Sequence, residues 1–496
     1  MNPQTSIALS VLLPFLGALG IGMTGRWPNV REAVTVGVSL LTFAVVLSLA
    51  GPVMQGARPE LAVLEVLPGL ALSFEVEPLG MLYALVASGL WIPTGLYAIG
   101  YCRGHGEENQ TRFFACFALA IGAALGIAMA GNLFTLFLFY EALTLSTYPL
   151  VTHYGNAEAR SAGRTYLGIL LGTSVGFLLL AIVWTWQITG TLDFRPGGIL
   201  AGRVQGPEAA ILLALYAFGT GKAALMPFHR WLPAAMVAPT PVSALLHAVA
   251  IVKAGVFTVL KVIVYIFGID FLAETGASTW LMYAASFTLV SASLVALTKD
   301  NLKARLAYST ISQLSYIVLG AALATAAGVV GSGMHIAMHA MGKITLFFCA
   351  GAIYVASHKK NISEMDGIGR RMPFTMIAFF LGALSIIGLP PTGGTWSKWY
   401  LMLGAAEGHG LFFMGVLMLS SLLSIAYLMP IVARAFFVEA EASGDPDHGE
   451  VSATGIQEAP VLCVVPLCLT ALGCLLLFVF AGPIYQLLLP IAGSGG

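Results

Sequence analysis

The sequence predicts an all-α polytopic membrane protein of about fourteen transmembrane helices, with two inverted five-helix repeats that each contain a broken helix. Three observations predict this fold. Of the 496 residues, 58% are hydrophobic and 9% are charged, whereas roughly 25% are charged in an average soluble domain. Apolar runs of about 20 residues, long enough to cross a bilayer as helices, recur along the whole chain. Glycines and prolines interrupt two of these runs at corresponding places.

The expected spans are centred near residues 14, 42, 88, 121, 142, 175, 217, 252, 286, 314, 343, 387, 423 and 475. Residues 1–105 then hold helices 1–3, residues 106–270 hold the first repeat (helices 4–8), and residues 271–440 hold the second (helices 9–13). Residues 441–496 hold an acidic loop and helix 14. The first run, from Ile7 to Met23, has no basic leader, so we expect a retained span there and not a cleaved signal.

Lysines and arginines are distributed unevenly between alternate loops. Most lie in one set of loops, and only Arg58, Arg195 and Arg203 lie in the other. Because basic loops stay in the cytoplasm, we expect a multi-pass protein of the inner (cytoplasmic) membrane with both termini on the outer side. The acidic loop between Glu439 and Glu450 then faces the cytoplasm. We expect it to be solvated, and docking of a partner is the alternative.

Two spans are broken by residues that disfavour a continuous helix. The seventh contains Gly219, Gly221 and Pro227, and the twelfth contains Pro390, Pro391, Gly393 and Gly394. Each proline lacks an amide donor and frees a carbonyl four residues earlier, at Ala223, Ile386 and Ile387, which then needs another partner. Each broken helix is the fourth of five, and an odd number of helices inverts the second repeat. Two unrelated kinks are the alternative.

Few ionisable residues lie in the middle of spans, and each one is costly to bury. They are Glu141, Lys222, Lys253, Lys343 and Lys398. Even the lenient insertion scale assigns roughly 2.5 to 3.5 kcal/mol to a charge at the centre of a helix. We therefore expect the set to be functional.

Glu141 is the only acid expected at mid-span, and Lys222, at the break of the seventh span, is its expected counter-ion. Burial disfavours a charged lysine and a nearby carboxylate favours it. Approach and separation of the two groups would therefore load and release a proton. The hypothesis predicts that Glu141→Gln abolishes transport.

Histidines and lysines continue this set in the second half of the chain. His247 and Lys253 are six residues apart, about 120° around a helix, so we expect water or another helix to link them. His335, His339 and Lys343 are spaced by four and share one helical face. Histidine exchanges protons near neutral pH, which favours a relay that ends at Lys398. Satisfied core histidines are the alternative, and we expect no metal site because further ligands are missing.

Other classes of function find no support in the sequence. The six cysteines show neither metal-ligand pairs nor an iron–sulfur spacing, and packing explains them. Net charge is zero, and there is no basic block and no glycine-rich phosphate loop. We expect no cofactor and no nucleic-acid partner. Lys261 is expected to snorkel to the outer surface and to have no role in transport.

At these residues the chain resembles the Mrp antiporter family, the antiporter-like membrane subunits shared by multisubunit cation/proton antiporters, respiratory complex I and membrane-bound hydrogenases. The resemblance covers about residues 75 to 440. Its motifs are Tyr-Glu-Ala at Glu141, Gly-Lys-Ala-Ala-Leu-Met-Pro-Phe-His-Arg-Trp at Lys222, Leu-Leu-His-Ala at His247, Lys253-Ala-Gly, Tyr308-Ser-Thr-Ile-Ser-Gln, His339-Ala-Met-Gly-Lys and Gly388-Leu-Pro-Pro. The resemblance implies fourteen helices with inverted repeats, a Glu and Lys pair in the first half-channel, and a second half-channel that ends at the twelfth span.

Within the family, the chain looks most like the D-subunit branch of Mrp-type Na+/H+ antiporters. Long antiporter subunits carry further C-terminal helices, whereas we expect one final span ending near Leu489 here. A lysine stands at Lys398, where one complex I homologue has a glutamate. The resemblance implies partners in the bilayer: other membrane subunits of a hetero-oligomeric complex, including a larger homologous antiporter-like subunit.

The expected function is to move protons against a monovalent cation, as a transporter subunit and not as an enzyme. Dehydrated Na+ needs several oxygen ligands, so we expect Na+ to cross mostly through a partner subunit. The main alternative is a proton-pumping subunit of a redox-driven complex, such as a complex I type NADH:quinone oxidoreductase or a hydrogenase or formate-linked complex. An inorganic-carbon-uptake complex or a scaffold with an inactive pathway are further alternatives.

Overall fold

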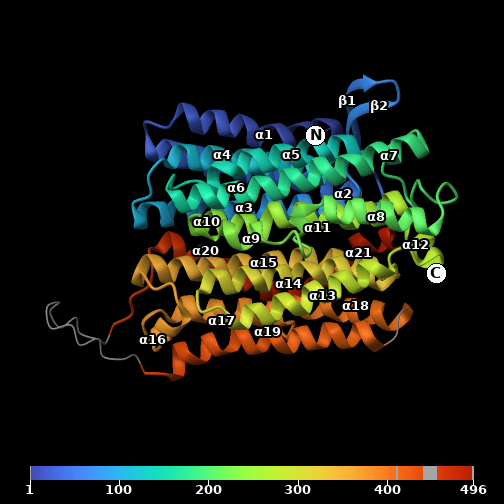
Figure 1. Cartoon of the computed structure of the whole chain (residues 1–496). Helices are drawn as coiled ribbons and strands as arrows, with labels where there is room; N and C mark the ends of the chain where they lie inside the picture. Colours follow the sequence, from blue (N-terminus) through green and yellow to red (C-terminus); the bar gives the residue numbers. More distant parts are fainter. Residues whose placement is uncertain (1, 409–410, 440–454, 494–496) are drawn as a thin grey trace.

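Long helices run side by side from one end of the molecule to the other in the computed structural model (Figure 1). The structure describes residues 2–408, 411–439 and 455–493. Most of the predicted acidic loop, including Glu441, Asp445 and Glu450, lies outside these ranges. Both chain ends lie at one end of the bundle, the outer end. The connections that carry most lysines and arginines lie at the opposite end, which we call the basic end.

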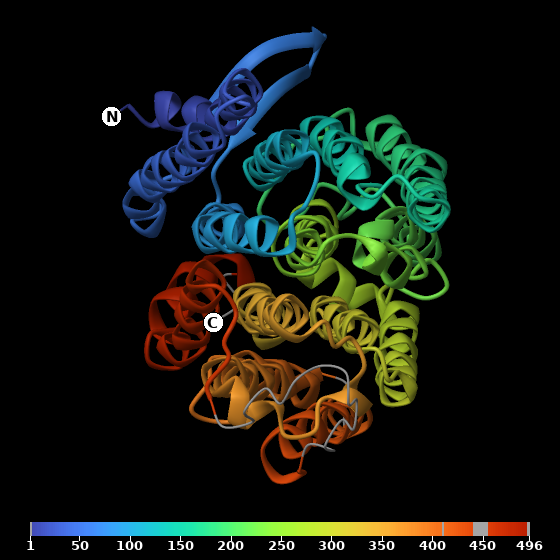
Figure 2. The ribbon, with the colours of Figure 1, turned by 90° about the vertical axis from the view of Figure 1, so that its left-hand side faces the viewer.

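The N-terminal part consists of three long helices and one hairpin. The helices are α1 (Pro3–Met23), α2 (Pro28–Met54) and α3 (Pro78–His105), and the antiparallel strands β1 (Glu60–Leu67) and β2 (Leu70–Glu75) join α2 to α3. The hairpin was not predicted, because charged and apolar residues alternate only briefly around its turn at Gly69, where φ is +78°. Seen from the basic end, α1, α2 and the hairpin project from one side of the bundle (Figure 2).

The first repeat contains two straight spans and three irregular ones. The straight spans are α4 (Gln110–Ala128) and α5 (Leu133–Val151). A π-helical turn (Ser174–Leu178) joins α6 (Ala157–Thr173) to α7 (Leu179–Thr189). The broken span is α8 (Gly206–Gly219), which is followed by a 3-10 turn (Gly221–Ala223) and α9 (Trp231–Ala234). The last span joins α10 (Thr240–Ala244) and α11 (Ile251–Val262) through a π-helical turn (Leu245–Val249), and a second such turn (Ile263–Phe267) follows.

The second repeat follows a short outer helix, α12 (Ile269–Thr275). Its spans are α13 (Thr279–Thr298), α14 (Leu302–Ala322), α15 (Ala326–Ser357), the broken span α17 (Pro373–Ile387) with α18 (Gly394–Gly408), and α19 (Leu411–Phe437). Helix α16 (Ile368–Arg371) lies at the basic end. Helices α20 (Val461–Val479) and α21 (Ala481–Leu488) complete the described chain.

Eleven helices within the described ranges are long and apolar enough to span a membrane. Helix α14 and the two broken spans bring the total to the predicted fourteen crossings. The spans built around α11 and α15 are the most enclosed: 100% and 94% of their apolar windows are buried inside the protein. The core therefore lies where the two repeats meet.

Two equivalent asparagines mark the inverted relation between the repeats. Asn132 begins α5 and accepts a hydrogen bond from the Thr135 amide at 2.8 Å, and Asn301 begins α14 and accepts one from the Ala304 amide at 3.0 Å. Each forms an isolated antiparallel bridge to the segment that follows the next span, at Asp193 or Asn361. The first pair lies at the outer end and the second at the basic end, as inversion requires.

Candidate functional site

Lys222 lies in the 3-10 turn that interrupts the α8 span, and it is fully buried. Its ammonium donates to the Tyr140 carbonyl at 2.9 Å and to the Thr144 hydroxyl at 2.6 Å, both on α5. The Tyr140 ring lies beneath the ammonium, with its centroid 3.1 Å away. Neutral dipoles and a ring therefore solvate this charge.

Glu141 is not in contact with its expected counter-ion. In the part of the chain that the structure describes, it forms no ion pair with Lys222, which instead bonds the preceding residue's carbonyl. Successive residues on a helix point about 100° apart, which turns Glu141 away from that carbonyl's neighbours. Glu141 lies between Leu138 and Leu145 on the outward stripe of α5, and those leucines are 43% and 59% exposed. Both of its carboxylate oxygens are buried without a hydrogen-bond partner among the described residues.

Lys253, His339 and His335 form a connected chain across α11 and α15. The Lys253 ammonium contacts Nδ1 of His339. The His339 and His335 rings follow at a centroid distance of 5.8 Å. All three side chains are at most 1% exposed. The predicted four-residue spacing thus brings the two histidines together, and the link to Lys253 comes from packing between helices.

The chain continues to the break of the twelfth span. His335 Nδ1 lies 2.9 Å from the Ser397 hydroxyl, beside Lys398 in sequence, and its Nε2 lies 3.2 Å from Oε1 of Gln313. Lys398 donates to the Ile387 carbonyl at 3.0 Å and to the Ser421 hydroxyl at 3.1 Å. One carbonyl freed by the prolines therefore finds its partner in the buried lysine.

Lys343 and His247 lie beside this chain and make different contacts. Lys343 donates to the Leu306 carbonyl at 3.2 Å and to the Ser309 hydroxyl at 2.7 Å. His247 packs on Phe347 at a centroid distance of 4.8 Å. Neither ring nitrogen of His247 has a hydrogen-bond partner within the described ranges. As expected, no direct contact joins His247 to Lys253 among the described side chains.

The prediction for Lys261 was wrong. Lys261 is fully buried and forms an ion pair with Glu77 at 3.1 Å, and it donates to the Ala130 carbonyl at 2.9 Å. Glu77 also accepts from the Tyr265 hydroxyl at 2.9 Å and from the amides of Leu79 and Gly80 at the start of α3. Glu141 is therefore not the one carboxylate in the interior, and a helix-capping acid supplied the missing partner.

The neutral groups that hold the lysines were not predicted. Thr144, Ser309, Gln313, Ser397 and Ser421 are polar residues within apolar spans, and each contacts one of the predicted residues. Their placement in apolar runs was a usable signal, because buried polar groups need partners. No cluster of three or more metal-ligating side chains occurs among the residues searched in the described structure.

The family profile described as "NADH:quinone oxidoreductase/Mrp antiporter, TM" matches residues 130–424, which include every predicted site residue. The chain belongs to this family. NADH-quinone oxidoreductase subunit N of Desulforudis audaxviator is 31% identical over 427 residues, 83% of each chain. A probable K(+)/H(+) antiporter protein of Rhizobium meliloti, its A/B component, is 30% identical over 414 residues, 81% of this chain and 40% of that protein.

Two solved structures share the fold of this family member. A chain of the Mrp complex from Dietzia sp. DQ12-45-1b matches with a TM-score of 0.87 at 22% identity, covering 99% of this chain and 97% of that one. A chain of the membrane-bound sulfane sulfur reductase, an archaeal respiratory membrane complex, matches with a TM-score of 0.85 at 24% identity, covering 98% and 97%. The relatives are thus subunits of multisubunit membrane complexes.

Proposed function

We propose that this chain is the proton-translocating subunit of a multisubunit monovalent cation (Na+)/H+ antiporter. The observation that carries the proposal is the buried chain from Lys253 through His339, His335 and Ser397 to the Lys398 break. Each member can exchange a proton or reorient a hydrogen bond, as a proton relay requires. Lys222 and Glu141 form the first half of the pathway, and His247 and Lys343 flank the second.

Protons are the cargo of this subunit, and the cation crosses mostly elsewhere. Na+ needs several oxygen ligands, ideally with negative charge. Of the two acids within the described spans discussed above, Glu77 is already bound by Lys261, and Glu141 faces outward. A neighbouring membrane subunit, including a larger homologous antiporter-like chain, supplies the cation site. The basic end faces the cytoplasm, and both termini lie outside the inner membrane.

The test of the pathway uses the complex in membrane vesicles, with proton flux followed by a pH-sensitive dye during cation pulses. Glu141→Gln is expected to abolish proton-coupled flux, because the amide cannot take up a proton. Glu274→Gln, an exposed change on α12, is the matched control and should keep full activity. Full flux in assembled Glu141→Gln complexes would contradict the proposal.

A second function is favoured by the full-length likeness to NADH-quinone oxidoreductase subunit N and by the fold shared with a respiratory reductase. In that function, electron transfer in partner subunits drives the same proton pathway. The two are separated by tagging this chain in its host, purifying the complex in mild detergent and identifying the other polypeptides. Small hydrophobic chains with one large homologue support the antiporter. Iron–sulfur or quinone-binding subunits support the redox-driven pump.

A further inference from the structure

A cavity of about 580 Å³ lies at the basic end, between the two repeats. The first repeat contributes Tyr154, Glu158 and Thr240, and the second contributes Lys303, Ala350 and Tyr354. His105, the last residue of α3, completes the wall on one side. The cavity is polar and large enough for several waters. Its described lining includes none of the predicted site residues.

Beside this cavity, one buried carboxylate gathers two histidines and a tyrosine. Glu107 is 8% exposed and follows α3. Its Oε1 lies 3.0 Å from Nδ1 of His105 and accepts the Tyr154 hydroxyl at 2.9 Å. Its Oε2 lies 3.6 Å from Nε2 of His153, whose Nδ1 is buried without a partner within the described ranges. His105 and Tyr154 belong both to this cluster and to the cavity wall.

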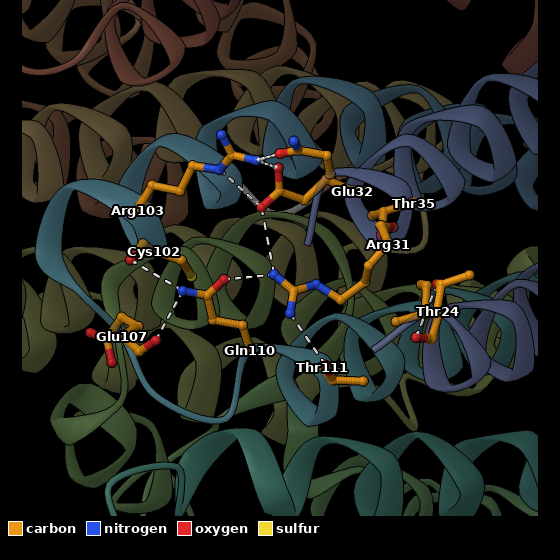
Figure 3. Close-up of polar contacts among 11 residues, drawn as sticks. Thr24, Arg31, Glu32, Thr35, Cys102, Arg103, Glu107, Gln110 and Thr111 are labelled. Atoms are coloured by element: carbon orange, nitrogen blue, oxygen red, sulfur yellow. Dashed lines mark hydrogen bonds and ion pairs between the residues drawn. The ribbon is translucent and has the colours of Figure 1, made fainter. Parts of the chain in front are cut away.

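A second polar network holds the Glu107 loop from the other side (Figure 3). Gln110 donates to the Glu107 carbonyl at 2.9 Å and accepts from the Arg31 guanidinium at 2.7 Å. Arg31 lies 3.5 Å from Glu32, which in turn binds Arg103. Arg31 and Glu32 are only 4% and 6% exposed. The network fixes the loop and leaves the Glu107 carboxylate free for the histidines.

The cavity reaches toward the proposed pathway. Thr240 in its wall precedes His247 by seven residues, about 10 Å along a helix. Ala350 in its wall is one turn from Phe347, on which His247 packs. Because both His247 ring nitrogens are buried and lack described partners, water is the natural group to satisfy them.

Charged and titratable groups face Glu107 from every neighbouring element. They are His105, Tyr101 and Cys102 of α3, His153 and Tyr154 beyond α5, Arg31 of α2 and Lys303 of α14. Burial alone would raise the pKa of the Glu107 carboxyl, but hydrogen bonds from His153 and Tyr154 and the charge of His105 outweigh it and hold that pKa below its ordinary value. Glu107 is therefore an anion near neutral pH, next to two imidazoles.

We propose that Glu107, His105 and His153 form the proton-loading site of the basic end. A proton from solution binds a histidine held at the Glu107 carboxylate. It then passes through water in the cavity, by way of the Lys303 and Thr240 wall, toward His247. Histidine suits this role because it gains and loses a proton near neutral pH. This inference rests on the proposed proton translocation and adds the site that supplies it.

The experiment uses vesicles of the complex with the basic end outward, and it measures proton-coupled flux while the external pH is varied. Glu107→Gln keeps the size of the side chain but cannot hold charge. We expect flux to fall by about tenfold above neutral pH and to approach the wild-type rate as the pH is lowered, because bulk protons then replace the loading site. Glu108→Gln, the exposed neighbouring acid, should match the wild type throughout.

His105→Gln keeps the inference falsifiable if Glu107→Gln fails to assemble, because His105 is a partly exposed side chain at a helix end. It should show the same loss above neutral pH. A wild-type pH profile in both variants, or an equal loss at every pH, would overturn the loading site. If the wild-type complex moves no protons, or if Glu141→Gln has no effect, the proposed function fails instead.

Discussion

At the scale of single residues, the buried lysines fall into two chemically different groups. Lys222, Lys343 and Lys398 each bond one backbone carbonyl and one hydroxyl. A lysine held by neutral dipoles can give up its proton without separating an ion pair. Lys261 is bound to the Glu77 carboxylate, so losing its proton would leave that charge uncompensated. Only the first group suits proton transfer, and the second fastens helices together.

The Glu77 and Lys261 pair should be a structural clasp between α3 and α11. Either Glu77→Gln or Lys261→Met leaves one buried charge alone, which costs about 3 to 5 kcal/mol. The double variant should recover most of that loss. The measurement is thermal unfolding of the purified complex in detergent. Lys222→Met is the control, since its removal strands no charge. Additive losses in the double variant would contradict the clasp.

The sequence could rank these lysines only by their position along a span. It identified the buried set, but Lys261 and Lys222 look alike when each is read with its own helix. The acid that separates them begins a helix far away in the chain, and only tertiary packing brings it to Lys261. Proline chemistry did predict that the Ile387 carbonyl needs a partner, although not that Lys398 supplies it.

At the scale of elements, the two broken spans place backbone where a regular helix would block it. The turn at Lys222 packs directly against α11 at Gly255, where a Cβ would overlap the Lys222 carbonyl carbon and the Ala223 nitrogen. The α17–α18 break is equally tight at Gly394, where a Cβ would overlap the Ser385 carbonyl oxygen. The glycines and prolines predicted both breaks, but not which helices close on them.

Gly255→Ala should displace the turn that holds Lys222. Its methyl group meets backbone atoms of that turn, which cannot rotate away as a side chain would. We expect proton-coupled flux to fall by at least about tenfold, with a modest loss of stability of about 1 to 3 kcal/mol. Gly172→Ala on α6 is the control, because nothing lies within 4 Å of its Cβ position. Equal flux in the two variants would show that the contact does not matter.

At the scale of the whole molecule, the enclosed centre and the exposed rim have different roles. The spans around α11 and α15 are almost entirely buried and carry the histidines and two of the lysines. Helix α5 carries Glu141 on a rim stripe with exposed leucines. Hydrophobic periodicity and the positive-inside rule predicted the span number and the inverted arrangement. They could not predict which face of a uniformly apolar helix is left open, because lipid-facing and protein-facing positions are equally hydrophobic.

The α5 stripe is where we expect a neighbouring membrane subunit to pack. Glu141 has buried oxygens without partners in the described chain, and a charge held that way needs a donor from outside. Leu145→Trp enlarges the stripe one turn from Glu141 and should release the partner while this chain stays in the membrane. Leu180→Trp on α7, at a similarly exposed position, should leave the complex intact. Native gel electrophoresis after mild extraction separates the two results. A complex that survives Leu145→Trp would mean that Glu141 faces lipid or water, and its donor would then have to reach it through solvent.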